Sequence, residues 1–207
     1  AADTDGSVTK VEFFQGTTLI GTAPSAPYSI DWVNVAAGSH ALTGKATDNL
    51  GAATTSAPVT ITVNATATVS ITSPANGAVL TAPANITLSA NAADADGTIA
   101  KVEFYDGATL AGTATTAPYS VTLANVAAGT RSFSARATDD RGATSTSAAV
   151  TVSVNALPTV SITTPANNAV VTAPANITIS ATATDSDGAI AKVDFYQGPS
   201  LVGTAPA

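Results

Sequence analysis

The sequence repeats itself every 91 residues, without insertion or deletion. The segment KVEFF at residues 10–14 returns as KVEFY at 101–105 and as KVDFY at 192–196. Self-similarity at a fixed period indicates an array in which each copy is one structural unit. The fold must therefore be one that about 91 residues can complete.

The phase of the period sets the expected domains. Residues 65–155 form a complete repeat, whereas 1–64 lack its first strands and 156–207 lack its last strands. The sequence has no starting Met and no leader peptide, as expected of a segment from a longer array. We therefore expect one complete domain and two partial ones.

Composition excludes several partners. Only 10% of the residues are charged, against roughly 25% in typical domains. The net charge is −7 with seven basic residues, which argues against nucleic acid, because phosphate binding needs clustered Lys and Arg. No apolar run approaches the roughly 18 residues that would suggest membrane insertion. The absence of Cys removes disulfides and thiol chemistry.

Alternation of apolar and polar residues predicts β-strands throughout, and no segment has helical periodicity. Turn signals rich in Gly, Asn and Pro separate the strands. This rhythm is typical of an antiparallel sandwich with about seven strands per repeat. The strands expected in the complete repeat are 69–72, 86–90, 102–105, 110–113, 119–123, 133–137 and 150–154.

Several motifs resemble the bacterial Ig-like repeats of large secreted and cell-surface proteins. They are VSITSPANG at 69–77, ADADG at 93–97, KVEFYDG at 101–107, APYS at 117–120, NVAAG at 125–129 and ATDDRG at 137–142. The resemblance implies an all-β chain of tandem Ig-like sandwiches. It also implies a secreted or cell-surface location, in adhesins, in extracellular filaments or beside catalytic domains. It leaves the function open, because function resides in sites and not in folds.

Acidic residues concentrate in two loops of each repeat. In an Ig-like sandwich these loops lie at the same end, where the linker from the preceding repeat enters. Converging carboxylates are what a Ca²⁺ ion requires, so a calcium site between repeats is one hypothesis. The nine candidate ligands, of fourteen acidic residues, are Asp3, Asp5, Asp48, Asp94, Asp96, Asp139, Asp140, Asp185 and Asp187.

The alternative is plain turn chemistry. In an Asp-x-Asp-Gly turn the Asp side chain caps its own backbone and the Gly takes a positive φ angle. The spacing is not that of an EF-hand, because the residue eleven positions beyond Asp94 is Tyr105 and not Glu. A full calcium site also needs six to eight oxygen ligands.

Aromatic residues suggest a second kind of site, a sugar-stacking platform for polysaccharide. Trp32 shares a predicted strand face with Tyr28, and the equivalent of Trp32 in the next repeat is Leu123, which favours core packing. Tyr105 and Tyr196 are expected on the surface, but one aromatic per repeat makes a thin platform. Polysaccharide is therefore a less favoured partner.

Catalysis has little support. The one histidine, His40, becomes Arg131 in the next repeat and is expected at a solvated strand edge. No Ser or Cys occupies a nucleophile turn. We expect that the chain is not an enzyme and that calcium is its only potential cofactor.

The linkers favour a structural role. Residues 155–159 make up a whole connection and include Pro158, so bending is restricted and an elongated rod is expected, advancing roughly 35–45 Å per repeat. We expect a stalk or spacer in an extracellular filament or long adhesin, with neighbouring repeats and like chains as partners. The alternative is an accessory module array of a secreted polysaccharide-degrading enzyme, acting as spacer or weak carbohydrate binder.

Overall fold

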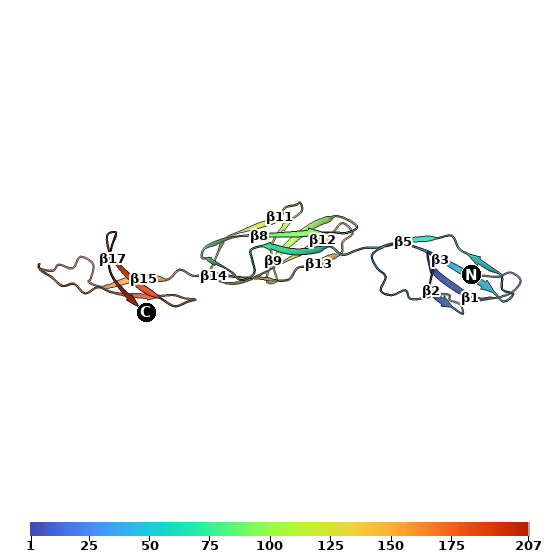
Figure 1. Cartoon of the computed structure of the whole chain (residues 1–207), viewed down its shortest axis with the longest axis horizontal. Coiled ribbons are helices and arrows are strands. Elements are labelled where there is room, and N and C mark those ends of the chain that lie inside the picture. Colours follow the sequence, from blue (N-terminus) through green and yellow to red (C-terminus); the bar gives the residue numbers. More distant parts are fainter. Residues whose placement is uncertain (207) are drawn as a thin grey trace. The chain divides into compact units, whose positions relative to one another are not determined.

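A computed structural model describes residues 1–206, and its regular secondary structure consists of β-strands (Figure 1). None of the described residues forms a helix that is long and apolar enough to cross a membrane. Contacts divide the chain into two compact units. The first contains 1–67 together with two loops of the middle repeat, 94–98 and 139–144, and the second contains 68–93, 99–138 and 145–207.

The first repeat is a single antiparallel sheet. Its strand order is β2-β1-β3-β4, and β5 pairs with β3 beyond the point where β4 ends. Val11 in β1 and Ala23 in β2 are its buried apolar side chains. The strands are β1 (Val8–Gln15), β2 (Thr18–Ala23), β3 (Gly38–Asp48), β4 (Ala53–Thr55) and β5 (Val59–Val63).

The middle repeat is a two-sheet sandwich. One sheet has the order β10-β9-β12-β14-β7, with β13 also on β12, and the other has the order β11-β8-β6. The pairs β10–β9, β12–β14, β11–β8 and β6–β8 are antiparallel, and β14 pairs with β7 in parallel. The strands are β6 (Thr68–Ser73), β7 (Ala78–Thr81), β8 (Ala84–Ala93), β9 (Ile99–Asp106), β10 (Thr109–Ala114), β11 (Tyr119–Val126), β12 (Gly129–Asp139), β13 (Thr144–Thr146) and β14 (Val150–Asn155).

The core of the middle repeat comes from alternate residues of both sheets. Phe104 and Phe133 on the larger sheet are fully buried, as are Ile86 and Leu88 on the smaller one. Alternation puts these side chains on inner faces and leaves Thr and Ser outside. Burial of large apolar side chains between two sheets is the main force that holds this repeat together.

The third repeat contains two separate strand pairs. They are β15 (Thr159–Thr164) with β16 (Ser180–Thr184), and β17 (Lys192–Gln197) with β18 (Ser200–Pro206). Ile162, Ile177, Tyr196 and Val202 line an apolar hollow on this repeat. The equivalent of Ile177 in the middle repeat, Ile86, is buried between the two sheets.

The structure confirms the all-β sandwich fold expected from the sequence. All seven strands predicted for the complete repeat are present, and the short β7 and β13 are additional. Residues 28–33, the equivalents of most of β11, do not form a strand in the first repeat. The reason is that β11 pairs with β8, and residues 1–27 contain no equivalent of the β8 residues that make this pair. The predicted domain boundaries remain predictions.

His40 is less solvated than predicted. It lies in β3 opposite Ile61 of β5, beyond the last β1–β3 pair at Leu42. Its ring is half-buried and meets the Trp32 ring edge-on, with the centroids 5.2 Å apart. Its Nε2 is 2.9 Å from the carbonyl oxygen of Ala36. These contacts give His40 a packing role.

Candidate functional site: the acidic loops and the linkers

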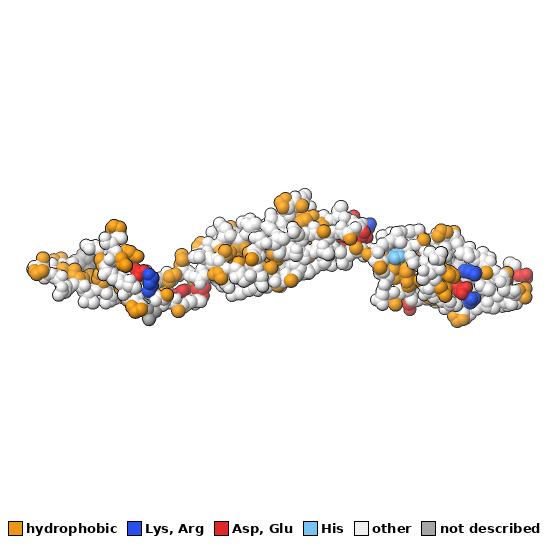
Figure 2. Space-filling model, in the orientation of Figure 1, with side chains coloured by type: hydrophobic (Ala, Val, Ile, Leu, Met, Phe, Trp, Pro, Cys, Tyr) orange, Lys and Arg blue, Asp and Glu red, His pale blue; other side chains and the backbone are white. Residues whose placement is uncertain are grey.

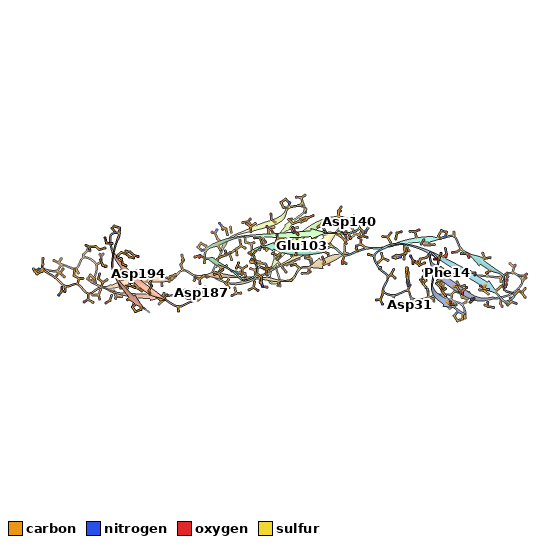
Figure 3. The ribbon with its side chains drawn as sticks, viewed as in Figure 1. Phe14, Asp31, Glu103, Asp140, Asp187 and Asp194 are labelled. Carbon is orange, nitrogen blue, oxygen red and sulfur yellow. The ribbon has the colours of Figure 1, made fainter. Side chains whose placement is uncertain are left out.

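The two acidic loops of the middle repeat lie against each other. The Thr98 N–H donates to Oδ1 of Asp140 at 3.2 Å, and the Asp140 N–H donates to the Thr98 carbonyl at 2.9 Å. The first repeat has the same pair of bonds between Ser7 and Asn49. Loops 94–98 and 139–144 are therefore held together, as the sandwich topology predicted. Figure 3 labels Asp140 in this loop pair.

Gly97 leaves space for two of the acidic side chains. A Cβ atom at this position would meet Oδ2 of Asp94 at 2.6 Å and Oδ1 of Asp140 at a shorter distance. The φ angle of Gly97 is outside the positive range, so the predicted reason for this glycine was wrong. Gly6 and Gly188 have the same relation to Asp3 and Asp185. Glycine is needed in this turn because the carboxylate lies directly against its backbone.

Asp139 organises the second loop. Its Oδ1 accepts the N–H groups of Arg141 and Ala143 at 2.9 and 2.8 Å, and Asp48 makes the equivalent bonds in the first repeat. Only 1% of Asp139 is exposed. Burial by itself raises its pKa, but hydrogen bonds from Asn64 and from the loop backbone bring the pKa below its usual value. The ionised form is therefore the one that this loop stabilises.

The linker after the first repeat binds to these loops. The Ala65 N–H donates to Oδ1 of Asp96 at 3.2 Å, and the Asn64 side-chain amide donates to Oδ2 of Asp139 at 2.7 Å. Arg141 Nη1 donates to both Oδ1 of Asn64 and Oδ2 of Asp96, each at 2.8 Å. We call these contacts of Asn64, Ala65, Asp96, Asp139 and Arg141 the first junction. Figure 2 shows acidic and basic side chains together at this end of the middle repeat.

The linker after the middle repeat repeats one of these bonds. The Ala156 N–H donates to Oδ2 of Asp187 at 2.9 Å, and these residues are the equivalents of Ala65 and Asp96. The side chain of Asn155, the equivalent of Asn64, donates instead to the neighbouring Ala156 carbonyl at 2.7 Å. We call the contacts of Asn155, Ala156 and Asp187 the second junction. The backbone bond is thus the feature that both junctions share.

The predicted calcium ligands fall into separate groups. Asp94, Asp96, Asp139 and Asp140 lie in the loops at the first junction, and Asp187 is in the second. The other predicted ligands are in the loops of the first and third repeats and are Asp3, Asp5, Asp48 and Asp185.

Two of these carboxylates already have hydrogen-bond partners within the chain. Asp96 and Asp139 are already bonded to the Arg141 guanidinium and the Asn64 amide. The Asp94 carboxylate is enclosed without a hydrogen-bond partner among the described residues. In this arrangement, residues 1–206 contain no group of three or more His, Cys, Asp or Glu side chains placed to hold a metal ion. Calcium binding therefore remains a prediction from the sequence.

Sequence reasoning missed Asn64 and Arg141. No sequence pattern assigned a contact to Asn64, yet its amide nitrogen donates to Asp139 and its amide oxygen accepts from Arg141 in the first junction. The signal for Arg141 was present in the aligned repeats: Asn49-Leu50 becomes Asp140-Arg141, so one acid and one base appear together. A paired change of this kind indicates a new local contact.

A second charged cluster lies on β9 and β12. Glu103 accepts from Lys101 at 2.9 Å and from Arg136 at 2.8 Å, and the Arg136 guanidinium lies 5.2 Å from the centre of the Tyr105 ring. The bonds from Lys101 and Arg136 lower the pKa of Glu103. The same strand positions are paired as Lys10 with Glu12 in the first repeat, and as Lys192 with Asp194 in the third. The repeat of this pair in all three copies indicates a role in stability.

Comparison with protein families gives one clear match. The model of the "Bacterial Ig domain" family matches residues 1–43, 68–135 and 158–207, well over half of the chain. No match was found among curated proteins.

Solved structures give more distant likenesses. Fibronectin(III)-like modules of Clostridium thermocellum CbhA are 28% identical with a TM-score of 0.43, covering 75% of this chain and 83% of that one. Domains 4–9 of the surface layer protein SbsC are 15% identical with a TM-score of 0.27, covering 95% and 29%. The Bacteroides ovatus protein SGBP-B, solved with a mixed-linkage heptasaccharide, is 19% identical with a TM-score of 0.23, covering 74% and 39%. These TM-scores are too low to support a functional argument.

Proposed function

Because this chain belongs to the bacterial Ig domain family, we propose that it is a structural array, a stalk or spacer in an extracellular filament or long surface adhesin. In this proposal, the junctions between repeats restrain the linkers and so give the array its spacer function. Neighbouring repeats and like chains are its partners, and it performs no catalysis.

One observation carries the proposal. A linker N–H donates to the Asp of the following repeat at both junctions, from Ala65 to Asp96 and from Ala156 to Asp187. A freely flexible linker would have no reason to repeat such a bond at equivalent positions. A bond to an ionised acceptor is stronger than one between neutral groups, and it restrains the first residue after each repeat. Restrained linkers are what a spacer needs to keep its ends apart.

The acidic residues have a structural role in this account. Asp139 and Asp48 close their own loops, and Asp96 and Asp187 receive the linkers. The hydrogen bonds that Asp139 accepts from Asn64 and from its loop backbone lower the pKa of this carboxyl. This use of the paired carboxylates supports a structural function over acid–base chemistry, which needs one of two carboxylates to be protonated.

The test is small-angle X-ray scattering of the 207-residue chain and of its Asp96→Ala, Asp187→Ala double variant. We expect the double variant to show a broader distribution of interatomic distances at unchanged circular dichroism. Asp5→Ala, the equivalent change in the first repeat, is the matched control and should leave the wild-type profile. Identical profiles for wild type and double variant would contradict the proposal.

Two further measurements test the alternative function and the calcium prediction. Saturable binding of soluble xylan, mixed-linkage glucan or chitin oligosaccharides would contradict the stalk proposal and favour an accessory module of a polysaccharide-degrading enzyme. We expect no saturable binding of these carbohydrates.

Repeating the scattering with EDTA and with added Ca²⁺ tests the calcium prediction. A profile that changes with Ca²⁺ would show that a metal ion contributes to the junctions.

A further inference from the structure

Arg141 joins the two sides of the first junction. Its Nη1 joins Asn64, which belongs to the linker, to Asp96, which belongs to the following repeat. Both distances are 2.8 Å, and the two side chains of the Arg141–Asp96 ion pair are less than half exposed. One cation therefore binds both sides of the junction.

The aligned repeats show that this cation is optional. The equivalent of Arg141 in the first repeat is Leu50, which is 79% exposed. The equivalent of Asp140 is Asn49, and its Oδ1 accepts the Ser7 N–H just as Asp140 accepts that of Thr98. The Asn49 amide and the Asp140 carboxylate thus accept a hydrogen bond from equivalent backbone N–H groups. This hydrogen bond therefore does not require the negative charge of Asp140. Arg141 offsets that charge among the carboxylates of the first junction.

The linker Asn residues have different partners at the two junctions. Asn64 donates to Asp139 and accepts from Arg141. Asn155 donates to the neighbouring Ala156 carbonyl. The Asn64 side chain therefore reports directly on the side-chain contacts of the first junction.

We propose that Arg141 determines how firmly a repeat holds the linker that precedes it. A repeat with Arg at this position joins the linker Asn to the receiving Asp, whereas a repeat with Leu, as at position 50, lacks this bridge. The stiffness of the array is thereby set repeat by repeat. This inference rests on the proposed structural role of the junctions.

The experiment is hydrogen exchange by NMR on the 207-residue chain. In Arg141→Leu, which copies the first repeat, the side-chain amide of Asn64 and the backbone amide of Ala65 should exchange roughly two- to fivefold faster, the range for an exposed ion pair. The Ala156 amide is the internal reference and should not change. Salt at about 1 M should speed Ala65 exchange in the wild type and have little effect in the variant, because it screens the ion pair.

Two variants complete the design. Arg131→His, which copies His40, removes a different exposed ion pair and should leave Ala65 exchange at the wild-type rate. Arg141→Lys keeps the charge and should restore most of the protection. Unchanged exchange in a folded Arg141→Leu chain would overturn the inference. The proposed function would survive that result if the Asp96→Ala, Asp187→Ala variant still broadens the scattering distribution.

Discussion

The middle and third repeats place the same side chains in opposite environments. Ile86 and Leu88 in β8 are 2% and 0% exposed, whereas their equivalents Ile177 and Ile179 are 55% and 37% exposed. In the middle repeat β8 pairs with β11 and belongs to a two-sheet sandwich, whereas residues 156–207 contain no equivalents of β11, β12 and β14. An apolar pattern therefore tells which side of a strand seeks burial, but burial itself depends on strands far along the chain.

The two junctions also place equivalent linker residues in different environments. Both contain the bond from a linker N–H to an Asp of the next repeat. Only the first has the side-chain bonds of Asn64, which come from the loop at 139–144. In the first junction, the loop at 139–144 of the following repeat adds side-chain contacts to the linker.

The largest difference is expected in the core. Ile86→Ala removes a buried side chain and should destabilise the middle repeat by about 2–5 kcal/mol. Ile177→Ala should change stability by less than about 0.5 kcal/mol, as for exposed sites. Denaturant unfolding followed by NMR signals of the middle repeat for the first variant, and of the third repeat for the second, checks both. Equal effects would mean that Ile177 is buried in solution.

The next effect concerns the loop glycines. Gly97→Ala forces Asp94 and Asp140 to move and should cost about 1–3 kcal/mol, as overpacking does. Gly188→Ala meets only Asp185 and should cost less. Thermal unfolding of the two variants measures the difference. A larger loss in Gly188→Ala would contradict the role given to the second loop.

A pH series compares the charged clusters. The pKa of Glu103 is lowered by Lys101 and Arg136, so its contribution is present above its unfolded pKa of about 4.3 and is lost as pH falls through the lower folded pKa. Glu103→Gln should therefore destabilise the chain at pH 6 and have a much smaller effect near pH 3, measured by urea unfolding. Asp194→Asn should show the same direction more weakly, because its partner Lys192 is more exposed. A loss that grows toward acid pH would contradict this assignment.

The smallest expected effect is the difference in stability loss between substituting Asn64 and substituting Asn155. Asn64→Ala removes bonds to Asp139 and Arg141 and should cost about 0.5–1.5 kcal/mol, whereas Asn155→Ala removes only a bond to its neighbour and should be close to neutral. Protection of the Asp139 loop amides against hydrogen exchange gives the measurement. Equal loss in both variants would show that the side-chain bonds of the first junction contribute nothing.

Local sequence patterns predicted most of the fold. Alternation located the seven main strands, since a strand with one buried face carries a period of two. It missed β7, whose ladder is made with β14 at the far end of the repeat, and it suggested a strand at 28–33 that lacks its partner. Strand pairing is long-range, and a local pattern does not contain it.

The candidate site was predicted only in outline. The recurring Asp residues indicated that the junctions matter, and the structure places Asp96 and Asp187 against linkers. The clamp by Arg141 and Asn64 was not predicted, because it joins positions 77 residues apart that no short motif links. The role of Gly97 depends on tertiary structure, since the crowding comes from Asp140 in another loop.

The most direct test of the account is ¹⁵N relaxation of the 207-residue chain. If the junctions are ordered, the amides of Ala65 and Ala156 should have order parameters close to those of the flanking strands, about 0.85, with Ala65 at least as ordered as Ala156. Order parameters below about 0.6 at both positions would mean flexible linkers. They would contradict the claim that each repeat holds the linker that precedes it.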